Sequence, residues 1–435
     1  MLKFVKMYSL TVAAMAIPLL IERGVIQPLV ARTSQSAPAV FGTWVWFLGA
    51  MMFVAMTVGY GAGLPLMRNL ADLNAKNRRQ WLTYARWWSY GITFPLLVTV
   101  SLVLFFYKRS ELGIDTAIWG GLAAFAAALT QIEYMSTSSV MRVAQRFGDL
   151  LTVRIIYVLP VVAGGLWLHS YGASSVMKVI SAAYACSFLF VFIAGRAMIR
   201  RFSWSIVMDI PSVKDSSVSF RMYFWVGAGS VLVSLADQAV VYVPRVMAGL
   251  LLEMRDVGVL VAATTGAALC VLPISMIGST FLSLLSRKKE VGWDHRQWRV
   301  FVVSVGSIGL AIGATVWYTR FLVLDLLYPT FKGAALAIYF WVAIAASAST
   351  MVALIRPVAL RFLSIHSVSS YSVFSVFVMT VLIYLFSFRG IEGVVIGYAA
   401  GAWGQLIIWS GFLWRAKDEF AQIEGSEVDV SKRLT

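Results

Sequence analysis

The sequence predicts an all-α polytopic membrane protein with about twelve transmembrane helices in two six-helix lobes. The 435-residue chain is 60% hydrophobic and only 13% charged, whereas soluble globular proteins carry about 25% charged residues. Apolar runs of about 20 residues recur along the chain, each long enough to cross a hydrocarbon core of ~30 Å. A central polar stretch separates six of these runs from six more, which predicts the two lobes.

The first apolar run follows Lys3 and Lys6 and therefore imitates a signal peptide. No small-residue cleavage site follows it, and apolar character resumes after Glu22 and Arg23, so we expect an uncleaved first span. The twelve spans are expected near residues 7–31, 41–63, 82–106, 116–140, 150–168, 175–194, 220–252, 257–286, 300–318, 334–355, 367–388 and 391–414. These spans divide the chain into a first lobe at 1–199, a cytoplasmic inter-lobe loop at 200–219, a second lobe at 220–415 and a polar cytoplasmic tail at 416–435.

The net charge of +16 is concentrated in short loops between the predicted spans. Most of these loop lysines and arginines fall on the face that also carries both chain ends. A basic excess at one membrane face sets the orientation of the protein and attracts anionic lipid. We therefore expect both termini in the cytoplasm, membrane lipid as a partner, and no nucleic acid.

The two predicted lobes open with similar segments. Fourteen residues separate Pro28 from Gly42, and the same number separates Pro244 from Gly258. In each lobe, a span with internal charged groups reaches the proline, makes a short outer turn and restarts at the glycine. Two parallel six-helix repeats of this kind are typical of transporters.

Charged residues within the predicted spans are the candidate functional groups. Glu22 and Arg23 lie about 23 Å into the first span at 1.5 Å per residue, and Asp237 lies at a similar depth in the seventh. A charge at the bilayer centre costs at least ~2.5–3.5 kcal/mol, so it usually faces a partner or a wet cavity. A purely structural Arg23–Asp237 or Glu22–Arg23 pair is one interpretation, and snorkelling of Arg245 to the outer interface is another.

Several stretches resemble one family of membrane exporters. These are Arg23 with PLVAR (residues 28–32), FGTW (41–44), RVMAGLLLEMRDVGVLVAA (245–263) and LPISMIGSTFLSLLS (272–286). Together and in this order they are similar to the bacterial polysaccharide-exporter and O-antigen-flippase families. Those families belong to the multidrug/oligosaccharidyl-lipid/polysaccharide (MOP) exporter superfamily. Lipid II flippases of that superfamily usually have fourteen spans, and the twelve predicted here argue against that branch.

The resemblance implies a V-shaped cavity between the lobes that accepts a polyisoprenyl-pyrophosphate-linked oligosaccharide. The expected function is that of a flippase in the bacterial inner membrane, serving surface or extracellular polysaccharide (O-antigen lipopolysaccharide, capsule or exopolysaccharide). A polysaccharide polymerase and chain-length machinery are the implied protein partners. Guanidinium groups match phosphate oxygens bidentately, so Arg23 and Arg245 are the candidate substrate-binding residues. Glu22 and Asp237 are the candidate coupling or gating residues, which hold these arginines or take a proton or a sodium ion.

Other functional classes are less compatible with the sequence. A drug/cation antiporter of the same superfamily would favour acidic residues in the cavity, whereas arginine is at least as prominent here. A membrane polysaccharide polymerase would typically carry a large outer loop with catalytic residues, and no predicted outer loop exceeds about fifteen residues. No phosphate-binding loop, metalloprotease motif or triad is recognisable. We therefore expect no enzymatic activity and no cofactor beyond a coupling ion.

Overall fold

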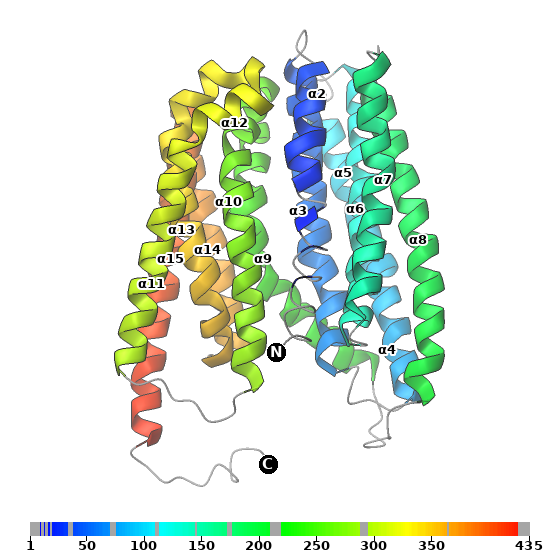
Figure 1. The fold of residues 1–435 in the computed structure, drawn as a ribbon, viewed down its shortest axis with the longest axis vertical. Helices are drawn as coiled ribbons and strands as arrows, with labels where there is room; N and C mark the ends of the chain where they lie inside the picture. The colour runs from blue at the N-terminus through cyan, green and yellow to red at the C-terminus, as the bar shows by residue number, and fades with distance from the viewer. Residues whose placement is uncertain are drawn as a thin grey trace.

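The computed structural model describes residues 20–33, 38–69, 75–108, 113–143, 146–171, 176–208, 219–287, 295–362 and 365–424, with a few isolated positions before residue 20. This described part of the chain is helical apart from turns and contains no strand. The helices form two bundles that stand side by side (Figure 1). The prediction of an all-α protein with two lobes is confirmed.

The first bundle, here called the N-terminal lobe, contains the elements from Glu22 to Met208. The predicted third span is one continuous helix in which a π-helical segment, η3, joins α4 to α5. The elements are η1 (Glu22–Ile26), α2 (Gln27–Thr33), α3 (Pro38–Asn69), α4 (Ala75–Trp87), η3 (Trp88–Thr93), α5 (Phe94–Lys108), α6 (Ile114–Val143), α7 (Phe147–Tyr171) and α8 (Val176–Met208).

The second bundle, the C-terminal lobe, contains the elements from Phe220 to Glu424. Two short helices, α12 and η4, fill the connection between the ninth and tenth spans and were not predicted. The elements are α9 (Phe220–Leu251), α10 (Met254–Arg287), α11 (His295–Tyr318), α12 (Arg320–Leu327), η4 (Pro329–Phe331), α13 (Lys332–Phe362), α14 (Ile365–Phe386), η5 (Ser387–Arg389) and α15 (Gly390–Glu424).

Some predicted boundaries fall outside the described residues. These are most of the first span before residue 20, the inter-lobe stretch 209–218 and the tail 425–435. Two helices in the described part of the chain are longer than the sequence predicted, because they continue into segments that were expected to be polar loops. Helix α8 continues to Met208, into the predicted inter-lobe loop, and α15 continues to Glu424, into the predicted tail.

Nine stretches of the described residues are long and apolar enough to cross a membrane. One of them, Val368–Phe412, includes most of both α14 and α15. Helix α6 is not among the nine because its second half carries Thr130, Gln131 and Glu133, followed by four consecutive hydroxyl residues. Those polar side chains are buried, which places them in the interior of the N-terminal lobe. The chain is a multi-pass membrane protein, and α6 corresponds to its predicted fourth span.

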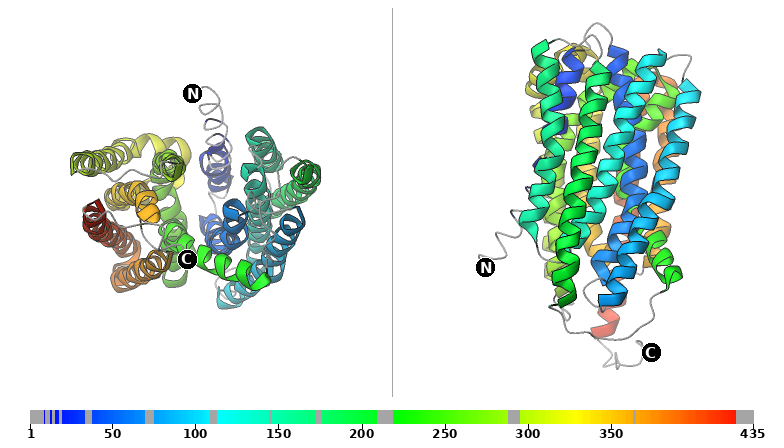
Figure 2. Two further views of the ribbon diagram at one scale, coloured as in Figure 1. Left: turned by 90° about the horizontal axis from the view of Figure 1, so that it is seen from below. Right: turned by 90° about the vertical axis from the view of Figure 1, so that its right-hand side faces the viewer.

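Helices α3, α9 and α10 join the two lobes. Along α3 and α9, the indole nitrogen of Trp46 donates to the Val246 carbonyl at 3.1 Å, and the Ser234 hydroxyl donates to the Thr57 carbonyl at 3.1 Å. Near the start of α9, the Tyr223 hydroxyl donates to the Ala62 carbonyl of α3 at 2.8 Å. One hydrophobic cluster contains buried residues from both lobes. Seen from below, α9 bridges the two bundles (Figure 2).

The repeated glycines face each other at this junction. A Cβ atom on Gly42 of α3 would lie 3.3 Å from the backbone nitrogen of Gly258 of α10, and one on Gly258 would lie 3.0 Å from Phe331. Both glycines therefore lie where neighbouring segments approach closely. Small residues allow this approach because the backbones themselves come into contact.

Gly42→Ala is expected to lower the stability of the lobe junction by about 1–3 kcal/mol, the usual cost of overpacking. The added methyl group would overlap the backbone carbonyl oxygen of Met254, which cannot rotate away. The apparent Tm of the purified protein measures the effect. Gly121→Ala is the matched control, because its Cβ would meet only the Phe47 ring at 3.8 Å. Equal Tm values for the two variants would contradict the close approach of α3 and α10.

Candidate functional site

An open cavity with an empty volume of about 510 Å³ lies mainly within the C-terminal lobe. Its walls come from α9, α10, α13 and α15, and polar groups on them are supplied by Thr264, Ser349 and Tyr398. Arg23 of η1 lines the same cavity, and so does Arg245 of α9. The structure therefore brings together the two arginines that were predicted to bind substrate.

Arg23 reaches the cavity from a π-helical turn. The backbone N–H of Gln27 donates to the carbonyl of Glu22, five residues earlier, which widens the helix at this point. Single π-turns within α-helices occur frequently at functional sites. Arg23 is only 6% exposed, and its own carbonyl accepts a 3.5 Å hydrogen bond from the Tyr328 hydroxyl. That bond attaches η1 to the C-terminal lobe.

Arg245 lies one residue after Pro244 in α9 and is 4% exposed. Its stem crosses α3 at Gly49, where an added Cβ would stand 3.4 Å from the Cβ of Arg245 and 3.7 Å from its Cδ. A glycine at this position leaves room for the long side chain. The interpretation of Arg245 as a snorkelling interfacial residue is wrong, because the side chain is buried beside the cavity.

Glu22 lies next to Arg23 but interacts with the N-terminal lobe. Its carboxyl group is a hydrogen-bond partner of the Tyr157 hydroxyl on α7, and it is within electrostatic range of Arg23, Arg245 and Arg154. The side chain is partly exposed. Glu22 thus faces the arginines on one side and buried tyrosines on the other.

Arg154 of α7 is a site residue that is not among the candidates from the sequence. It is 8% exposed, its Nη1 donates to the Gln131 side-chain oxygen at 3.2 Å, and its guanidinium carbon lies 3.1 Å from the centre of the Tyr134 ring. Gln131 inside an apolar span was the available signal, because a buried amide needs a polar partner.

The charges of this region do not balance. Arg23 and Arg245 form no ion pair with any residue in the described ranges, and Glu22 is the carboxyl group that acts on both of them together with Arg154. Three guanidinium groups against one carboxyl group leave an excess of positive charge within the membrane region. Because uncompensated buried charge is costly, the arrangement favours an anionic ligand.

Asp237 does not join this group. Its carboxylate pairs with Nη1 of Arg356 on α13, so the interpretation that Asp237 pairs with Arg23 is wrong. The Asp237 side chain is 52% exposed and that of Arg356 is 5% exposed. Arg356 also donates through Nη2 to the carbonyl of Val233. The pair joins α9 to α13, about 12 Å along α9 from Arg245 at 1.5 Å per residue.

No protein-family model matches the sequence, and no curated protein matches it. Solved structures do match the fold. An inward-facing multidrug resistance MATE family transporter of the MOP superfamily is 14% identical, aligns over 97% of this chain and 96% of its own, and has a TM-score of 0.58. The eukaryotic MATE transporter AtDTX14 is 12% identical over 96% of this chain and 99% of its own, with a TM-score of 0.60.

A third structure, of a MATE transporter in a bent conformation, is 15% identical over 97% of this chain and 98% of its own, with a TM-score of 0.54. At these identities the likeness is one of fold. The chain therefore has the fold of the MATE transporters of the MOP superfamily over nearly its whole length, as its sequence resemblance to that superfamily implied.

Proposed function

We propose that the protein is a flippase that moves a polyisoprenyl-pyrophosphate-linked oligosaccharide across the bacterial inner membrane for polysaccharide biosynthesis. One observation carries the proposal: Arg23 and Arg245 are buried beside one cavity and, within the described part of the chain, have no ion-pair partner. A diphosphate supplies the negative charge and the paired oxygens that two guanidinium groups bind.

The two arginines belong to different lobes. Arg23 is carried by η1 and Arg245 by α9, so a ligand held by both contacts both bundles. A ligand shifts a conformational equilibrium only through different affinities for the two states. Relative movement of the lobes changes the separation of Arg23 and Arg245, so diphosphate binding and lobe movement become linked. Glu22, next to Arg23, is the group that we propose to take a proton or a sodium ion in this exchange.

A drug/cation antiporter is the second candidate, because multidrug transporters share this fold. An organic cation would need acidic groups in the cavity, whereas the cavity wall carries Arg23 and Arg245. Glu22 is the carboxyl group that would have to bind the cation, but it lies within electrostatic range of three arginines. The charge of the site therefore supports the anionic substrate.

The proposed orientation places both chain ends in the cytoplasm, on the face where loop lysines and arginines are concentrated. The end of the bundles where α2 ends and α3 begins (top of Figure 1) then faces outward. The substrate would enter from the cytoplasmic leaflet, and a polymerase and chain-length machinery would receive it on the outer side.

Deletion of the gene is expected to trap lipid-linked repeat units in the cytoplasmic leaflet and to remove the surface polysaccharide. Protection of the radiolabelled units from a membrane-impermeant glycosidase in intact spheroplasts measures the trapping. A plasmid copy should restore both. Normal surface polysaccharide in a strain without a second exporter would contradict the proposal, and a loss of cationic-drug resistance alone would favour the antiporter.

A further inference from the structure

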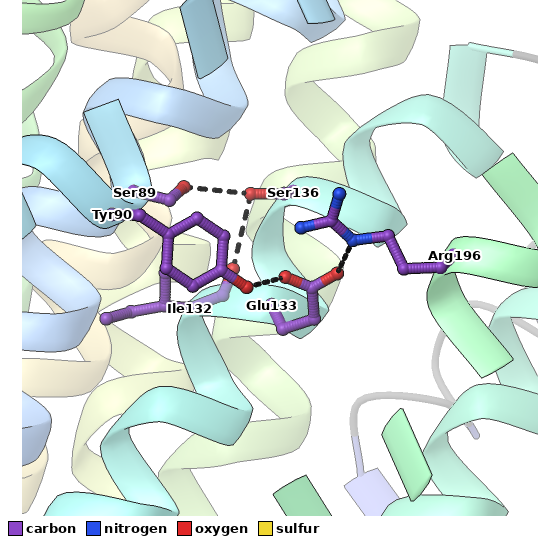
Figure 3. A network of polar contacts seen from close by, with 6 residues as sticks. All are labelled: Ser89, Tyr90, Ile132, Glu133, Ser136 and Arg196. Atoms are coloured by element: carbon purple, nitrogen blue, oxygen red, sulfur yellow. Dashed lines mark hydrogen bonds and ion pairs between the residues drawn. The ribbon is translucent and has the colours of Figure 1, made fainter. Parts of the chain in front are cut away.

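A second polar cluster lies in the N-terminal lobe, away from the cavity. Figure 3 shows Glu133 of α6 between Tyr90 of η3 and Arg196 of α8. The Tyr90 hydroxyl donates to one carboxylate oxygen, and Nε of Arg196 lies 3.5 Å from the other. The Glu133 side chain is 4% exposed and that of Arg196 is 27% exposed. The carboxylate is thus inside the lobe, and the arginine leads from it to the surface.

The orientation of Arg196 is fixed by its neighbours. Its guanidinium carbon lies 4.7 Å from the centre of the Phe192 ring and 5.9 Å from that of Tyr90. Within the described residues, Arg196 interacts with the Glu133 carboxylate and also with the Tyr90 hydroxyl. The Arg196 side chain is nevertheless partly exposed, so a ligand at the surface of α8 can reach it. Glu133 acts as a positioning residue for this group.

Two further arginines lie near Arg196 and Glu133. Arg86, near the end of α4, is exposed and lies within electrostatic range of Arg196, Arg200 and Glu133. Arg200 is also exposed, one helical turn after Arg196 on α8. In the described part of the chain, Glu133 is the carboxylate that acts on Arg86. Among the described residues, Arg86 and Arg196 thus share the single carboxylate of Glu133, which leaves an excess of positive charge at the surface.

Exposed apolar side chains precede Arg196 on α8. Leu189 is 54% exposed and Ile193 is 63% exposed. They precede Arg196 by seven and three residues, so the four positions 189, 193, 196 and 200 lie on one stripe of α8. Helix α8 stands at the outer edge of its bundle, with α4 beside its lower part (Figure 1). The stripe therefore changes from apolar to basic along the surface that faces the lipid.

We propose that Arg86, Arg196 and Arg200 bind the phosphate of an anionic phospholipid whose acyl chains lie along Leu189 and Ile193. Charge complementarity and the apolar-to-basic stripe select this occupant. Basic pockets between membrane helices bind phosphate-containing lipid head groups in the same way. The site is separate from the central cavity and requires no transport. The bound lipid would anchor the lipid-facing surface of the N-terminal lobe in the leaflet where α8 ends.

The test uses the purified full-length protein with dioleoylphosphatidylglycerol, dioleoylphosphatidylcholine or inorganic phosphate alone. Native mass spectrometry counts the retained lipid, and the apparent Tm follows stabilisation. We expect the anionic lipid to be retained and to raise the Tm, with no effect from phosphatidylcholine or phosphate. Arg86→Gln should weaken retention about fivefold, as each basic residue near an anionic surface contributes.

Arg196→Gln is combined with Glu133→Gln so that no buried carboxylate loses its partner, and the pair should also weaken retention. Arg389→Gln, an exposed arginine of η5 beside Phe388, is the matched control and should behave as the unaltered protein. Equal retention of the two lipids, or equal retention by Arg86→Gln and Arg389→Gln, overturns the proposal. Stabilisation by inorganic phosphate to the same Tm would show that the arginines bind a free anion and would overturn the lipid proposal.

Discussion

Replacing Arg23 with alanine is expected to reduce oligosaccharide translocation about 10- to 100-fold, the equivalent of one lost hydrogen-bonded contact to a charged group. The protein should still fold, because the guanidinium of Arg23 has no ion-pair partner among the described residues. Arg23→Lys keeps the charge but loses the planar fork that binds two phosphate oxygens. The translocation rate of Arg23→Lys should therefore lie between that of Arg23→Ala and that of the unaltered protein. Arg245→Ala should reduce translocation similarly.

The measurement is movement of a labelled polyisoprenyl-pyrophosphate-linked oligosaccharide across reconstituted liposomes. The apparent Tm of each variant separates a transport defect from a folding defect. Arg255→Ala is the control, since Arg255 is an exposed arginine in the first turn of α10, away from the cavity wall. Normal translocation by both Arg23 variants would show that Arg23 does not contact the substrate. It would also remove the principal support for an anionic ligand.

Asp237→Ala is expected to destabilise the C-terminal lobe by about 3 kcal/mol, the lower end of the range for removing one partner of a buried ion pair. The lower end applies because the Asp237 carboxylate is half-exposed and partly screened by solvent. The loss arises because the buried guanidinium of Arg356 keeps its charge without its carboxylate. Arg356→Met removes that charge and fills a similar volume, so it should cost less than Asp237→Ala.

The pair Asp237–Arg356 also predicts how the variants combine. Asp237→Ala together with Arg356→Met should be about as stable as Arg356→Met alone, because contacting residues do not contribute additively. Asp237→Ala together with Arg23→Ala should instead show additive stability changes, because these residues belong to different clusters. Unfolding of the purified variants measures both combinations. Additive losses for Asp237 and Arg356 would contradict the ion pair.

Local sequence determined the order of the long helices. The long membrane-spanning helices coincide with apolar runs in the sequence. An apolar run that crosses the membrane forms a helix, because its backbone hydrogen bonds must be satisfied within the segment itself. The matching positions of Gly42 and Gly258, each in the first turns of a helix after a short turn, were also visible in the sequence, but their contact with each other was not. The depth of Arg23 in the first span indicated that it is buried, whereas the burial of Arg245 was one of two alternatives that the sequence left open.

The partners of the buried charges were decided by tertiary structure. A soluble helix shows its inward face through alternating apolar and polar residues, but a membrane helix is apolar toward lipid as well as toward its neighbours. The sequence therefore indicated the depth of Asp237 in its span and not the direction of its side chain. Helix packing turned Asp237 toward Arg356, Arg154 toward Tyr134 and Glu133 toward Arg196. Those rotations depend on contacts between residues far apart in the chain, and only the folded bundle fixes them.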